Sequence, residues 1–526
     1  MTGKFLNINS ALKILILGFF IFFLILPLVK MFLFFGGEGI AEIGSEYVRR
    51  AFYNTLAVGI VSSLLSVGIG FFLAYLLLQT QTSIRPVFSA IFIIPMLVPT
   101  VAHGSGLILL FGNNAVLSRI LGLQTHIYGW GGCVAGFILC TYPTAFIMFC
   151  NVLRYEDTRP YEIADVLGVS KLRQFSGITL PYVFKSFTSI FCAIFALIIT
   201  DYGVPLMVGG QYKTLALLMY NDVVGLSKSN GGAISVLLLA VALIAFVIEL
   251  RNKTIPQSLS AKYKPYQHIK NRTFSWISKI ILSFTAIFIL FYIGIFSVTA
   301  FTARYPYNME FTLINFTRTL SGSGLSYLKN SLLGALGAAV FGTITAYVFA
   351  YYSARAASKT SAVHLLSICT AAIPGIVLGL GYVLAFKGSM IYGTMIILIL
   401  INIVHFFAPV YLLAYNALLK ISRDVESVAE VFGIGKFKAF VDIILPNTFT
   451  TAVEMFSYFF VYSMITISAV SFIANIRIKP LALMIPQYEN QQQSGNVAVV
   501  ALVILAVNLL LKFIVWLAKN KKVQYI

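Results

Sequence analysis

Charged side chains are scarce in this sequence of 526 residues. Asp, Glu, Lys and Arg make up 10% of it, while hydrophobic residues make up 59%. Soluble domains carry about 25% charged residues, so the composition excludes an ordinary soluble protein and predicts that a lipid bilayer surrounds most of the chain. The net charge of +20 follows the expected loops instead of forming one basic patch, so nucleic acid is not an expected partner.

Cysteine and histidine are also few, five of each, and they are scattered. Without a CxxC pair or a metal-ligand spacing, we expect packed, reduced thiols and no metal site. A phosphate-binding G-x4-G-K-[ST] loop is missing, since Gly435-Lys436 is followed by Phe437. The sequence also lacks a nucleophile–base pair of the kind that would indicate a membrane-embedded enzyme. We therefore expect a protein that is not an enzyme and that binds no cofactor itself.

Long apolar runs dominate what is present. About twelve segments are apolar over about 18 residues or more, the length needed to cross a bilayer as a helix. They lie at 12–35, 56–78, 87–111, 132–153, 184–208, 231–249, 277–300, 331–354, 363–386, 390–415, 448–474 and 497–518. Because they lack the alternating pattern of a membrane β-barrel, the predicted fold is an all-α integral membrane protein with about twelve transmembrane helices.

The positions of Lys and Arg predict the orientation. These residues are concentrated between the sixth and seventh expected spans and after the last one. Cytoplasmic loops carry such an excess. We therefore predict a multi-pass protein of the bacterial plasma (inner) membrane, with both the N- and the C-terminus in the cytoplasm.

The sequence also contains an internal repeat. Asn54-Thr55-Leu56 opens the second expected span, and Asn330-Ser331-Leu332 opens the eighth. A longer pattern, A-[DE]-V-x-G-x2-K-x3-F-x2-I-x-L-P, follows the fourth span of each half, at 164–181 and 429–446. Such a mixed pattern in constant register indicates a parallel duplication. We expect a six-helix half at 1–250, a basic cytoplasmic linker at 251–273 and a second six-helix half at 274–526.

This repeated loop resembles the EAA motif, E-A-A-x3-G-x9-I-x-L-P, of the permeases of binding-protein-dependent ABC importers. Helix number and duplication extend the resemblance to nearly the whole chain. It implies that the short helices in loops 156–181 and 421–446 dock on a cytoplasmic ATPase and transmit its movement to the membrane. The corresponding residues are Glu162, Ala164, Asp165, Gly168, Leu180 and Pro181 in the first loop, and Glu426, Ala429, Glu430, Gly433, Leu445 and Pro446 in the second.

Both loops depart from the family pattern. The first has Glu162-Ile163-Ala164 in place of Glu-Ala-Ala, and the second has Ser427-Val428-Ala429 with Glu426 displaced by one residue. These substitutions weaken the expectation of a specific ion pair from the motif glutamate of the second half, but they leave the docking role in place.

The resemblance also implies partners. The chain would work with two copies of a separate ATPase, which uses ATP and Mg, and with an extracytoplasmic solute-binding protein. Together they would move a small solute across the membrane by alternating access. The paired loops argue against the main alternative, an ion-coupled secondary transporter with two repeated halves.

Ionisable groups inside spans are candidates for the solute pathway. Asp201, Tyr202 and Gly203 lie in the fifth span, where Gly203 and Pro205 suggest a broken helix. The alternative for Asp201 is a carboxylate at a helix end. For Glu454 we favour a residue that snorkels to the interface or pairs with a loop cation, and for His405 a hydrogen-bonded packing residue.

The segment around Asp201 adds a weaker resemblance. Asp-Tyr-Gly-Val-Pro, followed by Gly-Gly-Gln-Tyr, looks like the fused permeases grouped with ferric-iron, phosphonate and thiamine uptake. The resemblance favours iron(III) or a phosphonate as solute, with thiamine or spermidine/putrescine as alternatives.

Overall fold

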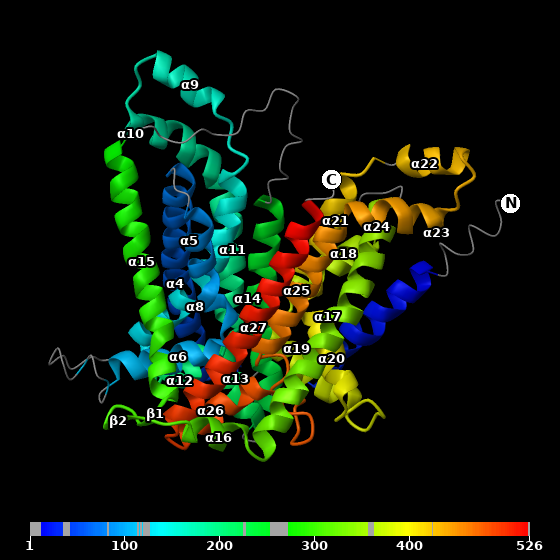
Figure 1. Ribbon diagram of the computed structural model, residues 1–526. Coiled ribbons are helices and arrows are strands. Elements are labelled where there is room, and N and C mark those ends of the chain that lie inside the picture. The colour runs from blue at the N-terminus through cyan, green and yellow to red at the C-terminus, as the bar shows by residue number, and fades with distance from the viewer. Residues whose placement is uncertain are drawn as a thin grey trace.

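The computed structural model describes residues 12–34, 43–80, 84–112, 115, 118, 127–224, 228–252, 272–355, 362–422 and 424–523. Residues 253–271, where the basic linker is expected, lie outside the described residues. The described chain is almost entirely helical (Figure 1). This agrees with the all-α membrane fold predicted from the apolar runs.

Seven described helices are long and apolar enough to cross a membrane as single units. The first span, Leu12–Phe34, includes η1 (Ile21–Ile25) and α2 (Leu26–Phe34). The others are α4 (Glu46–Gln79), α8 (Trp130–Leu153), α14 (Lys228–Asn252), α15 (Arg272–Ala300), α17 (Ser323–Arg355) and α27 (Ser494–Val523).

Four further spans are bent helix pairs, which raises the number of spans in the described chain to as many as eleven. The sharpest bends, 100° and 109°, separate Arg85–Leu97 from α6 (Thr100–Phe111) and Ala362–Ala372 from α19 (Gly375–Phe386). The other two pairs, bent by 52° and 56°, are Lys171–Phe184 with Ser186–Thr200 and α20 (Met395–His405) with α21 (Phe407–Leu419). Pro99 and Pro374 stand immediately before α6 and α19, and proline cannot continue a helix without losing a hydrogen bond.

The span expected at 448–474 is shorter than predicted. It corresponds to α25 (Phe449–Ile465), which has 17 residues, and the chain continues in turns after Ile465. Thr466, the first residue after the helix, has an extended backbone conformation. The length of an apolar run thus overestimates the length of the helix where the chain unwinds inside the protein.

The two ends of the molecule differ (Figure 1). At one end, here called the loop end, the two repeated loops project on opposite sides. The opposite end, here called the far end, carries the antiparallel pair β1 (Thr302–Arg304) and β2 (Asn308–Phe311) with α16 (Ile314–Leu320) and α26 (Met484–Asn490). The helix α27 runs from the far end to the loop end.

The first helix of each half packs against the other half. Tyr382 of α19 donates a hydrogen bond of 2.8 Å to the carbonyl of Phe23 in the first span. In the same way, Tyr292 of α15 donates one of 3.2 Å to the carbonyl of His103 in α6. Small residues allow these approaches: a Cβ on Gly106 would lie 2.8 Å from the Tyr292 hydroxyl, and one on Gly381 would lie 2.9 Å from the Pro27 carbonyl. The two halves are therefore interlocked.

The repeated tripeptides form equivalent clasps at the far end. The Asn54 amide donates to the Lys213 carbonyl at 3.0 Å, and the Thr55 hydroxyl accepts from the Leu215 N–H at 2.8 Å. In the second half, Asn330 donates to the Arg477 carbonyl at 2.9 Å, and Ser331 accepts from the Leu481 N–H at 2.7 Å. Each clasp satisfies one buried backbone N–H, that of Leu215 or Leu481, and one carbonyl of the segment that precedes it. This role explains why both tripeptides keep an amide followed by a hydroxyl.

Removing one clasp hydroxyl should destabilise the protein. In Ser331→Ala the buried Leu481 N–H loses its acceptor, which costs about 1–3 kcal/mol. We expect a lower thermal unfolding midpoint in detergent, and a similar decrease for Thr55→Val. The control is Thr345→Val, because the Thr345 hydroxyl bonds only to the Phe341 carbonyl of its own helix. A midpoint of Ser331→Ala no lower than that of the control would contradict the clasp.

Candidate functional site

The two repeated loops fold in the same way at the loop end. The first contains α9 (Arg159–Val166), α10 (Lys171–Gln174) and η3 (Phe175–Thr179) and leads into α11 (Leu180–Thr200). The second contains α22 (Asp424–Val431), α23 (Lys436–Ala439), η5 (Phe440–Ile444) and α24 (Leu445–Asn447) and leads into α25. Leu180-Pro181 and Leu445-Pro446 begin the helices α11 and α24, where proline is tolerated because the first-turn N–H groups have no helical partner.

The motif glycine of each loop closes a helix. Gly168 has φ +69° and Gly433 has φ +71°, a conformation that strongly favours glycine. The Ala164 carbonyl accepts from the N–H of Val169, and the Ala429 carbonyl accepts from that of Ile434, both at 2.9 Å. In each loop, this hydrogen bond across the last helical turn is the one that defines a Schellman cap. Ala164 and Ala429 are both buried beneath it.

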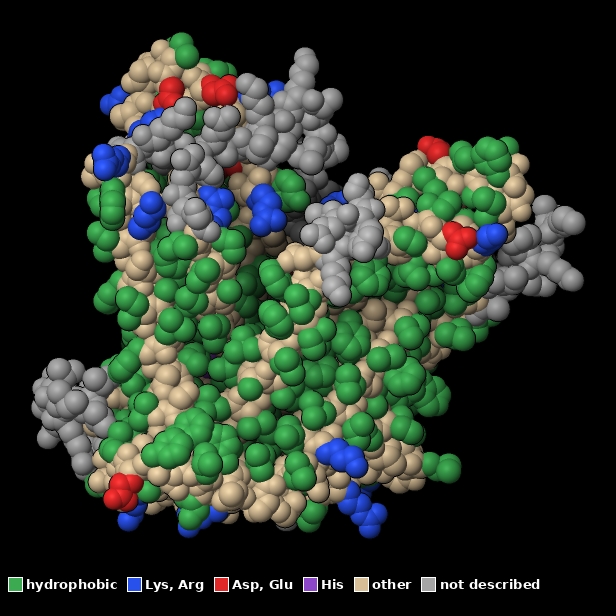
Figure 2. Space-filling model, viewed as in Figure 1, with side chains coloured by type: hydrophobic (Ala, Val, Ile, Leu, Met, Phe, Trp, Pro, Cys, Tyr) green, Lys and Arg blue, Asp and Glu red, His purple; other side chains and the backbone are tan. Residues whose placement is uncertain are grey.

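Each loop presents the same set of apolar side chains to its surroundings. Four positions are more than half exposed in both loops: Ile163, Val166, Leu167 and Leu172 in the first, and Val428, Val431, Phe432 and Phe437 in the second. Every pair is separated by 265 residues. Hydrophobic side chains stand out on both projecting loops in the space-filling view (Figure 2). Apolar patches of this kind mark a surface for a partner.

The loops differ in how they are held. In the second loop, the Glu426 carboxylate of α22 accepts from the Tyr351 hydroxyl at 2.8 Å and pairs with Arg355 at 3.0 Å, both on α17. The motif glutamate of the second half thus has an ion-pair partner within the chain. At the equivalent place in the first loop, Tyr161 donates to Glu156 and shares a hydrogen bond of 2.6 Å with Thr179.

The remaining acidic motif residues are exposed. Glu162 and Glu430 lie on the outer sides of α9 and α22. Asp165 accepts from Lys171 and from Gln174, each at 2.5 Å, and these bonds lower the pKa of the Asp165 carboxyl. Asp165 therefore braces α9 against α10.

Sequence reasoning missed Glu156, the first residue of the first loop, which is buried. Burial raises the pKa of its carboxyl to about 7, although the hydrogen bond from Tyr161 acts in the opposite direction. The repeat gave no signal for this residue, because the equivalent residue of the second half is Ile421. Its place at the start of a repeated loop was the only available signal.

The predicted pathway residues lie at a break in the fifth span. The helix α11 ends at Thr200, and α12 (Gly203–Val208) follows, so the break suggested by Gly203 and Pro205 is present. The Asp201 carboxylate accepts from the Thr100 hydroxyl at 2.7 Å and from the Val204 N–H at 3.1 Å. A Cβ on Gly203 would lie 2.4 Å from the Thr100 hydroxyl oxygen. The structure thus brings Asp201 and Gly203 together with Thr100, which the sequence did not indicate.

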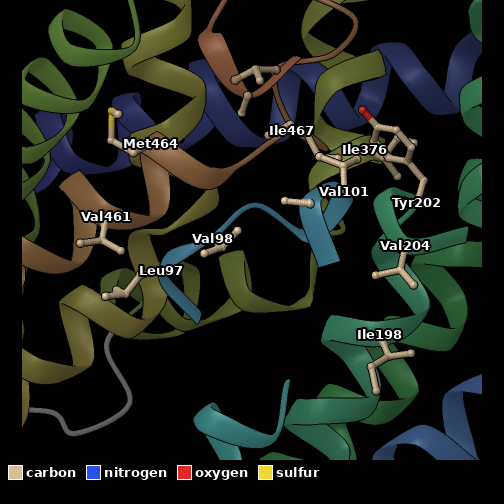
Figure 3. Packing of buried hydrophobic residues seen from close by; sticks show 14 of the residues in the cluster. Leu97, Val98, Val101, Ile198, Tyr202, Val204, Ile376, Val461, Met464 and Ile467 are labelled. Atoms are coloured by element: carbon tan, nitrogen blue, oxygen red, sulfur yellow. The ribbon is translucent and has the colours of Figure 1, made fainter. Parts of the chain in front are cut away.

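Tyr202 lies at the contact between the two halves. It is fully buried, its hydroxyl is hydrogen-bonded to Ser471, and its ring stacks on Tyr220 at 4.3 Å between centroids. Around it gather Val101, Ile376 and Ile467, as Figure 3 shows. Val101 and Ile376 hold equivalent positions in α6 and α19, and so do Tyr202 and Ile467 in the segments after α11 and α25. We call these four residues the central contact.

The two other ionisable candidates have different surroundings. Glu454 pairs with Lys519 of α27, in agreement with the expected ion pair. His405 lies against Gly375 and Phe406, and its Nδ1 is buried with no hydrogen-bond partner in the described chain. The expected hydrogen bond of His405 is therefore wrong for the described residues, because apolar groups pack on its ring. No group of three or more His, Cys, Asp or Glu that could hold a metal ion occurs among these residues.

Comparison with known proteins gives a family and several relatives. The model of the family described as "Binding-protein-dependent transport system inner membrane component" matches residues 66–260 and 342–521. The ferric transport system permease protein FbpB of Actinobacillus pleuropneumoniae is 24% identical over 99% of this chain and 80% of its own length. The putative ferric transport system permease protein FbpB 1 of Haemophilus influenzae is 26% identical over 90% and 79%.

Other similarities are more limited. A spermidine/putrescine transport system permease protein PotC homolog of Mycoplasma genitalium is 28% identical over 34% of this chain and 61% of its own length. Among solved structures, the crystal structure of a bacterial alginate ABC transporter, in complex with an alginate pentasaccharide-bound periplasmic protein, contains a chain that is 16% identical. Its TM-score is 0.42, and the similarity covers 50% of this chain and 99% of that chain.

Glu156 should make stability depend on pH. A folded pKa of about 7 against an ordinary value of 4.5 means that the folded state holds the proton more tightly. This stabilisation is complete below about pH 4.5 and is lost as the pH rises through about 7, by at most about 3 kcal/mol. We expect the thermal midpoint of the wild type to fall more between about pH 5 and about pH 8 than that of Glu156→Gln. Glu162→Gln, at an exposed position of α9, is the control; equal pH profiles for all three proteins would refute the prediction.

Proposed function

Because the chain belongs to the family of binding-protein-dependent transport system inner membrane components, we propose that its two repeated loops dock two copies of a separate ATPase and that its solute is iron(III). The chain is the membrane-spanning permease subunit of an ABC importer and not itself an enzyme. This family assignment argues against the ion-coupled secondary transporter.

The observation that carries the docking proposal is the equivalence of the two exposed surfaces. Four apolar positions of α9 and α10 recur in α22 and α23, and each set is fixed by the same glycine-capped turn. Two equal surfaces fit two equal partners. A monomeric soluble surface has little reason to expose such clusters.

The proposal assigns an orientation. The loop end would face the cytoplasm, where an ATPase can use ATP and Mg, and the far end would face the extracytoplasmic solute-binding protein. The termini would then be cytoplasmic in a bacterial plasma membrane. The basic residues in the last turns of α27, Lys519, Lys521 and Lys522, support this orientation, because cytoplasmic segments carry an excess of Lys and Arg.

The proposed mechanism is alternating access. Closure of the ATPase pair would draw the two loops together, and each loop leads directly into a helix, α11 or α25, that ends at the central contact. Separation of Tyr202 from Ile467 would then open the path toward the far end. The second loop moves as one body with α17 because the Arg355–Glu426 ion pair joins them.

Two observations support iron(III) as the solute. Two relatives that resemble nearly the whole chain are named as ferric transport permeases. Asp201 offers a carboxylate, a ligand type that suits hard cations, next to the central contact. In such systems the binding protein would make most of the selection, and a phosphonate is the second candidate.

The docking surfaces can be tested by removing one apolar side chain from each. In the double variant Leu167→Ser and Phe432→Ser, each site loses the burial of a large apolar side chain, about 1.5–3 kcal/mol, or at least about tenfold in affinity. We expect the ATPase to be lost from an affinity purification of the tagged chain in mild detergent. Each single variant should lose it partly.

The control for this experiment lies at the other side of the molecule. Met390 is 98% exposed, so Met390→Ser makes a similar chemical change away from the loops. Retention of the ATPase by the double variant, at the level seen with Met390→Ser, would refute docking at these surfaces.

Asp201 can be tested for a role beyond helix capping. Asn caps helices about as well as Asp, so Asp201→Asn should preserve the break but remove a charged ligand. We expect uptake of iron(III) into proteoliposomes that contain the whole transporter to fall about tenfold, while ATPase copurification stays unchanged. Thr100→Val removes the hydrogen bond and keeps the carboxylate, so it should retain most of the uptake. A greater loss in Thr100→Val than in Asp201→Asn would assign Asp201 a structural role only.

A further inference from the structure

A cavity of about 360 Å³ lies at the loop end, between the first loop, α4 and α15. Its walls are largely aromatic: Phe71 and Tyr75 come from α4, Phe175 from η3 and Phe274 from α15. Tyr75, Tyr161 and Thr179 supply its hydroxyl groups. The cavity therefore connects a loop of the first half with the first helix of the second half.

The second half has the same aromatic frame at this place. Tyr75 packs on Phe175 with centroids 5.2 Å apart, and the equivalent Tyr351 packs on Phe440 at 5.1 Å. There the Tyr351 hydroxyl bonds to Glu426, which also pairs with Arg355. In the first half, the hydroxyl of Tyr75 makes no hydrogen bond within the described chain, and Gln79, which stands in the place of Arg355, has a buried Oε1 without a partner there.

The first loop cannot form the equivalent ion pair to its second span, because Tyr161 stands in the place of Glu426 and Gln79 in the place of Arg355. An ion pair joins α22 to α17, whereas a cavity separates part of the first loop from α4. A bound molecule that fills the cavity and reaches across to α15 would supply the missing connection.

The cavity adjoins surfaces that face lipid. Phe72, which lines it, is 47% exposed on the apolar span α4. On α15, Trp276 and Ile277 follow Phe274 by less than one turn and are more than half exposed. An acyl chain in the adjacent leaflet can therefore reach the aromatic walls without crossing water.

The rim of the cavity is basic. Arg173 lies between the lining residues Leu172 and Gln174, and Arg272 precedes Phe274 by two residues; both arginines are exposed. The lining cation Lys171 is already paired with Asp165. No Asp or Glu is among the residues that line the cavity, and Lys and Arg side chains stand out around this part of the loop end in Figure 2. Basic pockets between helices at the cytoplasmic side suit anionic lipid headgroups.

We propose that this cavity binds an anionic phospholipid from the leaflet at the loop end. One acyl chain lies among Phe71, Tyr75 and Phe175, and the phosphate group lies between Arg173 and Arg272. The lipid joins the first loop to α15, as the Glu426–Arg355 pair joins the second loop to α17. The proposal depends on neither the ATPase nor the solute, so it can fail or hold independently of the proposed function.

The test is retention of lipid by the purified full-length chain. Protein would be equilibrated with vesicles of phosphatidylcholine mixed with phosphatidylglycerol, transferred to mild detergent and analysed by native mass spectrometry. We expect the wild type to retain phosphatidylglycerol in preference to phosphatidylcholine. The double variant Arg173→Gln and Arg272→Gln should retain less of it, by about fivefold for each charge removed.

The duplication supplies a matched control. Lys438 is exposed at the position of the second loop that is equivalent to Arg173, so Lys438→Gln removes the equivalent charge from the loop that the Glu426–Arg355 ion pair already joins to α17, and retention should be unchanged. Leu76→Tyr, which copies Tyr352 of the second half into the cavity wall, should reduce retention of both lipids. If that variant does not fold, the arginine variants still decide. Equal retention of the two lipids by the wild type, or full retention of phosphatidylglycerol by the double arginine variant, would overturn the proposal.

Discussion

A helix that breaks inside a bilayer must find partners for its backbone groups within the protein, and this constraint organises the centre of the molecule. The breaks before α6 and α19 and after α11 and α25 all come together where the two halves meet. Asp201 and Thr100 satisfy one of them by capping α12 and by bonding to each other. Because neither half covers these breaks alone, the central contact between Val101, Tyr202, Ile376 and Ile467 (Figure 3) adds to the contacts of Tyr292 and Tyr382 that interlock the halves.

The two halves have the same structure where the backbone leaves a helix, and they differ where side chains join one helix to another. The glycine caps and the far-end clasps are nearly identical in the two halves, since each satisfies backbone groups that have no other partner. The ties between loop and membrane are different: Tyr161 with Glu156 and Thr179 in one half, Glu426 with Arg355 and Tyr351 in the other. Side-chain networks can be exchanged without unfolding the turn that they support, so the halves have room to respond differently to the same movement.

Sequence periodicity and repetition were sufficient to predict the helical membrane fold and the two loops. Long apolar runs need no partner to be recognised, and a capped turn such as that at Gly168 depends on a few neighbouring residues. Contacts between distant segments carry no such signal. The packing of Tyr382 against Phe23, the bond between Asp201 and Thr100, and the burial of Glu156 join or enclose residues by tertiary structure alone. For the same reason, the run at 448–474 predicted a longer helix than α25, because apolar residues also fill the unwound centre.

The path from each loop to the centre follows one membrane segment of the chain. The helix α11 has 21 residues between the first loop and Asp201, and α25 has 17 residues between α24 and Thr466, which correspond to about 30 Å and about 25 Å at ~1.5 Å per residue. The first of these paths contains the 52° bend between Lys171–Phe184 and Ser186–Thr200, so a displacement imposed at the first loop reaches the central contact only through that bend, whereas α25 carries one through a single helix. The anchor of Glu426 to Arg355 opposes separate movement of the second loop. In the first loop, the aromatic cavity beside Tyr75 leaves room for movement, and a molecule that filled it would reduce that room.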